Sequence, residues 1–288
     1  MRKFFQFVFS VSVRLLTAVT VLALAFGIYF IVHEALPTFQ EVSLSDFLLT
    51  SRWMPIAYTG EAAFGIFHFI AATVYVSLLA MILSVVVGLG AALFLSCVAT
   101  ERMRSLLYPF VDLLAGIPSV VYGFVGLTVL VRLFLKAGVH TGSCVLAAAI
   151  LLAIMLLPYL VSSCSESLLK AKEEYLPAAA VLGVSKWYAI TTIVLPAAWK
   201  NIWISMILAI GRAMGETMAV MMVMGNANLF PTLLGKSESI AALIALEMGT
   251  AVAGSTHYHA LYAAGLVLML LLFLINIGIT LIHDRLMR

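Results

Sequence analysis

Long apolar segments alternate with short polar segments along this chain. A helix needs about 20 apolar residues to cross a bilayer, and runs of that order recur through the whole sequence. The expected spans are residues 15–32, 67–98, 106–135, 145–161, 199–224 and 261–282. The pattern therefore predicts an all-α, polytopic integral membrane protein with about six transmembrane helices.

Two features interrupt this pattern. Gly116-Ile117-Pro118 falls inside the third expected span, where a proline removes a helix hydrogen bond and clashes with the preceding turn. We expect a kink or a break at Pro118. A kink that packs against a neighbour is favoured over a half-helix whose free amides face an anion. A polar stretch over residues 162–187 separates the fourth span from the fifth.

The first span resembles a signal peptide in part. Arg2 and Lys3 precede an apolar stretch, and Ala23-Leu24-Ala25 is similar to a cleavage site. The apolar run nevertheless continues to Val32, which is long enough to cross a bilayer. We therefore expect an uncleaved membrane anchor.

Composition supports a membrane protein and excludes several other classes. Hydrophobic residues make up 64% of the chain and charged residues 10%, whereas soluble domains carry about 25% charged residues. The net charge of +3 is dispersed, so no nucleic-acid surface is expected. Cys97, Cys144 and Cys164 fall in or beside apolar runs without metal-site spacing, so we expect small buried side chains.

The basic residues indicate which side of the membrane each loop faces, because cytoplasmic loops carry an excess of Lys and Arg. With six spans, one side collects Arg2, Lys3, Arg14, Arg102, Arg104, Lys170, Lys172, Lys186, Lys200, Arg285 and Arg288. The other side holds Arg52, Arg132, Lys136 and Lys236. Both termini are therefore expected in the cytoplasm.

The fifth span contains the strongest candidate for a functional site. Arg212 and Glu216 are four residues apart, so on one continuous helix they can pair. Gly211 and Gly215 form a GxxxG motif that lets another helix approach closely. Charged groups in hydrocarbon are costly, so the pair either fixes helix packing or provides a polar step for an anionic substrate. We favour the second interpretation and place Arg212, Glu216 and Thr217 on the candidate path.

Two other polar features carry weaker signals. His257 and His259 lie two residues apart in an outer loop, but no third ligand is apparent, so we expect no metal site. Glu247 is expected on a short helix of the same loop, on a solvated face.

A small-residue segment at the inner membrane surface is a candidate docking element. Ala178, Ala179 and Ala180 favour a helix, Gly183 is expected to end it in a turn, and Pro196 precedes the fifth span. The segment resembles the coupling loop of ABC-importer permeases, in which EAA, a glycine, an isoleucine and Leu-Pro recur at fixed spacing. Residues that match this motif are Ala178, Ala179, Gly183, Ile193, Leu195 and Pro196. Pro177 replaces the glutamate, with Glu173 and Glu174 one turn earlier.

Other segments are similar to the PstC family of phosphate-importer permease subunits. They include residues 114–123 and 211–220, together with Trp53-x-Pro55, Phe64-Gly65-Ile66 and Gly225-Asn226. The resemblance implies three protein partners besides membrane lipid: a PstA-like second permease subunit, a PstB-like cytoplasmic ATPase dimer and a PstS-like extracytoplasmic phosphate-binding protein. ATP and Mg²⁺ would bind on the ATPase. It also implies residence in the bacterial inner membrane.

These observations together predict a permease subunit that moves inorganic phosphate inward. The chain has no Walker A glycine loop, so it should bind no cofactor and should hydrolyse no ATP itself. Residues 1–65 would form an anchor helix and external loop, and residues 66–288 the permease domain, with the coupling loop at about 166–196. The alternatives are a permease for sulfate or molybdate, an intramembrane enzyme, and a non-transporting assembly or sensory subunit.

Overall fold

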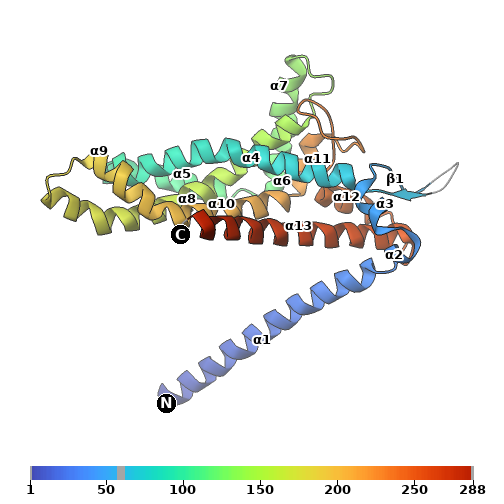
Figure 1. Cartoon of the computed structure of the whole chain (residues 1–288), viewed down its shortest axis with the longest axis horizontal. Helices are drawn as coiled ribbons and strands as arrows, with labels where there is room; N and C mark the ends of the chain where they lie inside the picture. Colours follow the sequence, from blue (N-terminus) through green and yellow to red (C-terminus); the bar gives the residue numbers. More distant parts are fainter. Residues whose placement is uncertain (1, 57–61, 287–288) are drawn as a thin grey trace.

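A computed structural model of the chain describes residues 2–56 and 62–286 (Figure 1). Arg288, which enters the charge pattern above, lies outside the described residues. Within this part, six helical segments are long and apolar enough to cross a membrane. The expected all-α, polytopic architecture is therefore confirmed.

Three of the expected spans are single long helices in the structure. Helix α1 covers Arg2–Ala35 and α13 covers Thr256–Leu286. Helix α4 covers Phe67–Leu93 and continues as the π-helical segment η1, Phe94–Val98. Their sequences are uninterrupted apolar runs, so every backbone polar group can be satisfied within the helix.

The expected third span is divided into two differently directed parts. Helix α5, Glu101–Ala115, ends before Pro118, and α6, Ser119–Val125, begins directly after it. The chain continues as η2, Gly126–Leu130, and α7, Val131–Lys136, which points away from the long axis of the bundle (Figure 1). The interruption was expected, but it is a complete break and not the favoured kink, because proline lacks the amide hydrogen and disfavours a helical residue before it.

The fourth span is longer than expected. Helix α8 covers Val145–Val181, so the fourth span does not end near residue 161 but continues as a helix through most of the polar stretch 162–187. Lys170 Nζ lies 2.8 Å from Glu166 Oε1 one turn away, an arrangement that supports a charged helix outside the bilayer. Helix α9, Lys186–Ala189, follows and leads into η3, Ile190–Val194.

The fifth span was expected to be continuous over residues 199–224, and that expectation is wrong. Helix α10 covers Leu195–Met214, and a separate helix, α11, covers Met218–Met224. Gly215 ends α10 and the next two residues connect the helices. Glycine is a poor helix former and allows this interruption without a proline.

Short elements gather at the end of the bundle opposite α9 (Figure 1). They are α2, Thr38–Glu41; α3, Leu44–Leu49; β1, Trp53–Met54; β2, Ala63–Phe64; and α12, Ile240–Glu247. The strands are antiparallel, with Trp53 opposite Phe64. Buried residues of these elements and of α13 form one hydrophobic cluster, which fastens this end of the molecule together.

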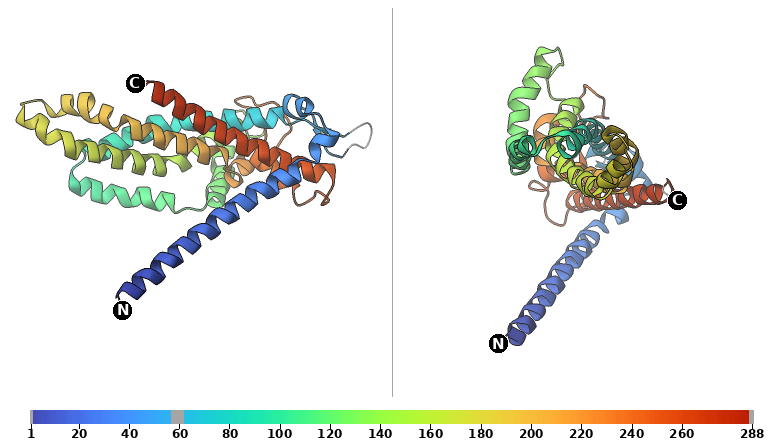
Figure 2. Two further views of the ribbon diagram at one scale, coloured as in Figure 1. Left: turned by 60° about the horizontal axis from the view of Figure 1, so that its bottom comes forward. Right: turned by 90° about the vertical axis from the view of Figure 1, so that its left-hand side faces the viewer.

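Helix α1 stands apart from the other helices. It contacts α13 near the end that carries α2 and then diverges from the bundle (Figure 2). None of its most apolar window is buried within the chain. The first residues of α1 and the last residues of α13 both lie in the half of the molecule that contains α9 (Figure 1).

Candidate functional site

A cavity of about 510 Å³ opens between α5, α6, α8 and the end of α10. Its walls mix apolar side chains with hydroxyl and charged groups. The polar side chains that line it are Arg104, Tyr108, Ser119, Tyr122, Tyr159, Ser162, Ser163, Glu166 and Arg212. The cavity is therefore a polar chamber between the helices of the bundle.

Arg212 lies on the wall of this cavity, in the last turn of α10. Its side chain is exposed, and no carboxylate in the described part of the chain lies within 4.0 Å of it. The phenols of Tyr122 and Tyr159 line the same cavity. The Tyr122 hydroxyl donates to the Leu114 carbonyl at 2.9 Å and so bridges the break between α5 and α6. The cation is available to a ligand in the cavity.

Glu216 does not pair with Arg212 in the described structure, contrary to the geometry expected for one helix. The four-residue spacing places two side chains together only on a continuous helix, and α10 ends at Met214. Glu216 Oε1 instead accepts from the Ala219 amide at 3.3 Å, at the start of α11. The Thr217 hydroxyl donates to the Gly215 carbonyl at 3.3 Å. Of the three residues placed on the candidate path, Arg212 alone lines the cavity.

The two glycines of the expected GxxxG motif have different surroundings. A Cβ at Gly211 would lie 3.9 Å from Asn276 Nδ2 of α13, an ordinary contact between neighbouring helices. A Cβ at Gly215 would meet only the carbonyls of α10 itself. Gly215 therefore ends a helix and does not pack against one, because the helix break removes it from the expected seam.

Gly123 and Gly126 are among the glycines that do allow close packing, and the sequence did not single them out. A Cβ at Gly123 would lie 2.7 Å from Met222 Sδ and 3.1 Å from the backbone of Ala219, both on α11. A Cβ at Gly126 would lie 2.6 Å from a methyl group of Leu151 on α8. The two half-helices α6 and α11 thus pack closely. Two glycines three residues apart directly after a proline break were the available signal.

The candidate docking element has the turn that the sequence predicts. Gly183 has φ +72°, a left-handed conformation that side chains other than glycine adopt at a cost. Its amide donates to Ala180 and the Val184 amide donates to Ala179, at 3.1 and 3.0 Å. This pair of bonds is the Schellman motif that ends a helix at a glycine. The glycine turn is confirmed, although the helix that it ends is α8 itself.

The tip around this turn exposes large apolar side chains. Val181 is 88% exposed, Leu182 80% and Trp187 67%. Beyond the tip, Ile193, Leu195 and Pro196 lie where η3 passes into α10. Apolar groups of this size concentrated at a projecting end are typical of a protein-binding surface.

Behind the tip, a buried cluster connects it to the membrane helices. The cluster contains Ile190, Val194, Cys97, Cys164 and Leu168 from η3, η1 and α8. Cys97 and Cys164 are free, like Cys144, and all three are buried, which confirms their interpretation as small core residues. The tip is therefore packed, through this cluster, against the membrane helices.

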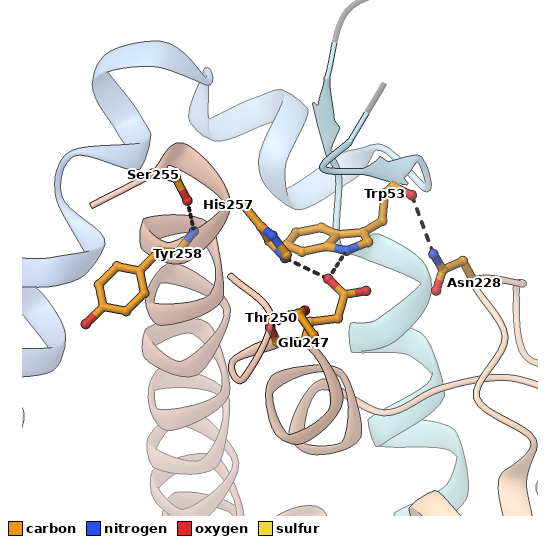
Figure 3. A network of polar contacts seen from close by, with 7 residues as sticks. All are labelled: Trp53, Asn228, Glu247, Thr250, Ser255, His257 and Tyr258. Carbon is orange, nitrogen blue, oxygen red and sulfur yellow. Dashed lines mark hydrogen bonds and ion pairs between the residues drawn. The ribbon is translucent and has the colours of Figure 1, made fainter. Parts of the chain in front are cut away.

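Polar contacts at the opposite end of the bundle hold its short elements together (Figure 3). Glu247 Oε2 accepts from Trp53 Nε1 at 2.9 Å and lies 2.8 Å from His257 Nε2. The expectation of a solvated face for Glu247 is therefore wrong, since Trp53 of β1 lies against it. His259 Nδ1 contacts the Glu34 carbonyl oxygen at 2.8 Å. His257 thus contacts Glu247 and His259 contacts Glu34, so the two histidines do not point at a common site.

Glu238, next to α12, gives a pH-dependent prediction. Burial, with a smaller contribution from the Glu247 charge, raises the pKa of the Glu238 carboxyl from 4.5 to about 7. The folded protein therefore holds this proton more tightly than the unfolded chain does, so stability should fall as the pH rises from about 4.5 to about 7 and then level off. Glu238→Gln should remove this dependence, worth on the order of 3 kcal/mol. Thermal unfolding of both proteins in nanodiscs between pH 5 and 8 measures the difference; parallel profiles would contradict it.

Comparisons with known proteins indicate similarity to transport proteins. The family described as binding-protein-dependent transport system inner membrane component matches residues 84–288. The probable ABC transporter permease protein YqgH of Bacillus subtilis is 32% identical over 85% of this chain and 79% of that protein. The phosphate transport system permease protein PstC of Xylella fastidiosa (strain Temecula1) is 35% identical over 84% of this chain and 80% of that protein. The probable PstC protein of Methanocaldococcus jannaschii is 30% identical over 88% and 85%.

A solved structure shares the fold. An inward-facing conformation of the MetNI methionine ABC transporter aligns with a TM-score of 0.59 over 75% of this chain and 94% of that chain. Sequence identity in this alignment is 16%, so the similarity concerns the fold alone.

Proposed function

This chain belongs to the family of binding-protein-dependent transport system inner membrane components, and from that premise we propose that it is the membrane-spanning permease subunit of an ATP-driven importer for inorganic phosphate. The observation that carries the choice of substrate is the similarity to phosphate transport permeases over more than four fifths of the chain. An unpaired arginine in a polar cavity supports the same choice, because a guanidinium fork suits an oxyanion.

Arg212 is the residue that we assign to substrate binding on the path. Phosphate near neutral pH carries one to two negative charges, and a bare dianion in hydrocarbon is prohibitively costly. Glu216 and Thr217 lie at the break between α10 and α11, one turn from Arg212. Their proposed role is to stabilise this break between the helices and thereby to orient the Arg212 side chain.

The projecting tip of α8 and α9 is the proposed docking site for a cytoplasmic ATPase. Residues of the coupling motif surround it, and the buried cluster behind it leads to α4 and α10. ATP and Mg²⁺ would bind on that partner, and closure of the ATPase dimer would move the tip. Pro177 and Glu173 are exposed on this end of α8 and would face the same partner.

The remaining partners follow from the exposed surfaces. Helix α5 has no buried residue, and a second permease subunit would cover it. The end with α2, α3 and α12 would face outward and receive the phosphate-binding protein. The tip of α9 and both termini would then be cytoplasmic, in agreement with the distribution of basic residues. We place the protein in the bacterial inner membrane, with lipid around α1.

Uptake into vesicles tests the proposed function. The chain would be reconstituted in vesicles with its second permease subunit and ATPase. The binding protein would be added at the outer face, and accumulation of labelled phosphate inside the vesicles would be measured. ATP-dependent accumulation that excess sulfate or molybdate leaves unchanged is expected. Accumulation that either competitor suppresses would assign another oxyanion. Failure to co-purify with an ATPase, together with chemical turnover by the chain alone, would favour an enzyme.

A further inference from the structure

Arg104 is a second cation on the wall of the cavity that contains Arg212. It lies one turn into α5 and is half-buried, with its guanidinium carbon 5.7 Å from the centroid of the Tyr108 ring. This position holds the guanidinium beside the cavity, because a cation over an aromatic face is attracted by the ring quadrupole. From sequence alone, Arg104 was one of several basic residues at the inner surface.

The two arginines lie at opposite ends of the cavity. From Arg104 to Leu114, α5 rises about 15 Å along its axis, and both residues line the cavity. Arg212 lies 17 residues beyond Leu195 on α10, about 25 Å from the end of that helix next to the tip. It lines the cavity together with Tyr122, which bonds to the Leu114 carbonyl, so Arg212 belongs to the Leu114 end. Arg104 therefore marks the inner mouth and Arg212 the deep end.

Neither arginine is neutralised by a carboxylate in the part of the chain that the structure describes. Ion pairs there involve neither residue. Glu166 is the carboxylate on the cavity wall, and it lies 2.8 Å from Lys170. Between the arginines the wall offers hydroxyl groups from Tyr108, Tyr159 and Ser162, among others. The chamber therefore has an excess of positive charge along its length.

An excess of charge at both ends has a consequence for release. A single deep cation binds an oxyanion strongly and retains it. For conduction, binding must be favourable enough for the anion to enter, and several sites must share the anion so that it can leave. A second cation about 15 Å nearer the cytoplasm lowers the energy of the departing anion before water can solvate it fully.

We propose that Arg104 forms a second oxyanion position at the inner mouth of the cavity and speeds release of phosphate from Arg212 into the cytoplasm. This inference rests on the proposed function for the identity of the anion. The anion class itself, a small oxyanion, follows from two unpaired guanidinium groups and the hydroxyl groups on the wall of the cavity.

Uptake by the assembled transporter gives the first test. Arg104→Gln should lower the maximal rate of phosphate uptake about tenfold. Arg104→Lys should keep at least half of that rate, because the attraction of a departing anion depends on the positive charge more than on the planar geometry of the guanidinium group. Arg102→Gln is the matched control, since Arg102 is exposed, lies two residues away and does not line the cavity. Equal uptake by the Arg104→Gln and Arg102→Gln complexes would overturn the proposal.

A thiol placed in the cavity reports its charge without transport. Ser162→Cys, in the whole complex in inside-out vesicles, would be modified with an anionic and a cationic thiosulfonate of similar size. Arg104→Gln should slow the anionic reagent about tenfold relative to the cationic one, and Arg102→Gln should leave the ratio unchanged. The complex without Ser162→Cys gives the background, because the three native cysteines are buried.

The two measurements separate failure of this inference from failure of the proposed function. If the wild-type complex transports no phosphate, but Arg104→Gln changes the reagent ratio at Ser162→Cys, the substrate is contradicted and the anion position is supported. If the wild-type complex transports phosphate, but Arg104→Gln leaves the ratio at Ser162→Cys unchanged, the function is supported and the inference is overturned.

Discussion

Arg212→Gln should abolish phosphate uptake by a complex that still assembles in the membrane. Arg212 is the cation at the deep end of the polar cavity, where no carboxylate of the described chain compensates it. Each hydrogen bond to a charged partner contributes about 1.5–3 kcal/mol. Loss of a bidentate pair therefore predicts a decrease of at least about 100-fold, measured as initial uptake of labelled phosphate.

Arg212→Lys separates charge from geometry. Lysine keeps the positive charge but loses the planar fork, so uptake should be intermediate, about tenfold below wild type. Lys200→Gln is the matched control, because Lys200 lies exposed on the same helix and away from the cavity. Near-wild-type uptake by well-assembled Arg212→Gln would exclude a substrate role for this arginine.

Glu216→Gln should lower uptake only mildly, since the glutamine side chain can still accept a hydrogen bond from the Ala219 amide.

Gly183→Val should uncouple ATP hydrolysis from transport. The φ of +72° at Gly183 is accessible to glycine, while a β-branched residue there is strongly disfavoured. A Cβ would meet no atom within 4 Å, so the effect comes from the backbone and not from a clash. Loss of the turn would displace Leu182 and Trp187, which form the exposed tip. Stimulation of the ATPase by the loaded binding protein should disappear, together with uptake.

Gly183→Asn provides the control for this turn. Asparagine tolerates the left-handed conformation at a low cost, so this variant should bind the ATPase and transport at near the wild-type rate. Co-purification of the ATPase and substrate-stimulated ATP hydrolysis are the measurements. Normal coupling in Gly183→Val, or equal losses in both variants, would show that the turn geometry is not what matters.

Local features of the sequence were sufficient to predict much of the fold. Uninterrupted apolar runs defined α1, α4 and α13, and Pro118 defined the break before α6, because both signals depend on a few neighbouring residues. Gly183 predicted its turn for the same reason. Arg212 was identified as a path residue from its cost in a membrane, and the structure places it on the cavity wall.

The features that sequence reasoning missed depend on contacts between distant segments. Residues 211–220 are compatible with one helix, yet the chain breaks there and α11 packs on α6 across Gly123. Glu247 is polar in an outer loop, and only the fold brings Trp53 to it. Arg104 belongs to a charged turn in the sequence, and its proximity to the cavity depends on how α5 packs against α8. Single-helix periodicity contains none of this information.

The unequal burial of the helices has a consequence for biogenesis. Helix α1 has a mean hydropathy of 2.5 over its most apolar window and needs no protein contact there, so it can leave the translocon and wait in lipid. The segment Ser119–Lys136 has a mean hydropathy of 1.7 and depends on α8 and α11 through Gly123 and Gly126. Because α11 is synthesised about a hundred residues later, this segment should be retained by the translocon or a membrane chaperone until then. In ribosome-bound nascent chains truncated before α11, this segment should therefore crosslink to the translocon or the chaperone, and in full-length chains it should not.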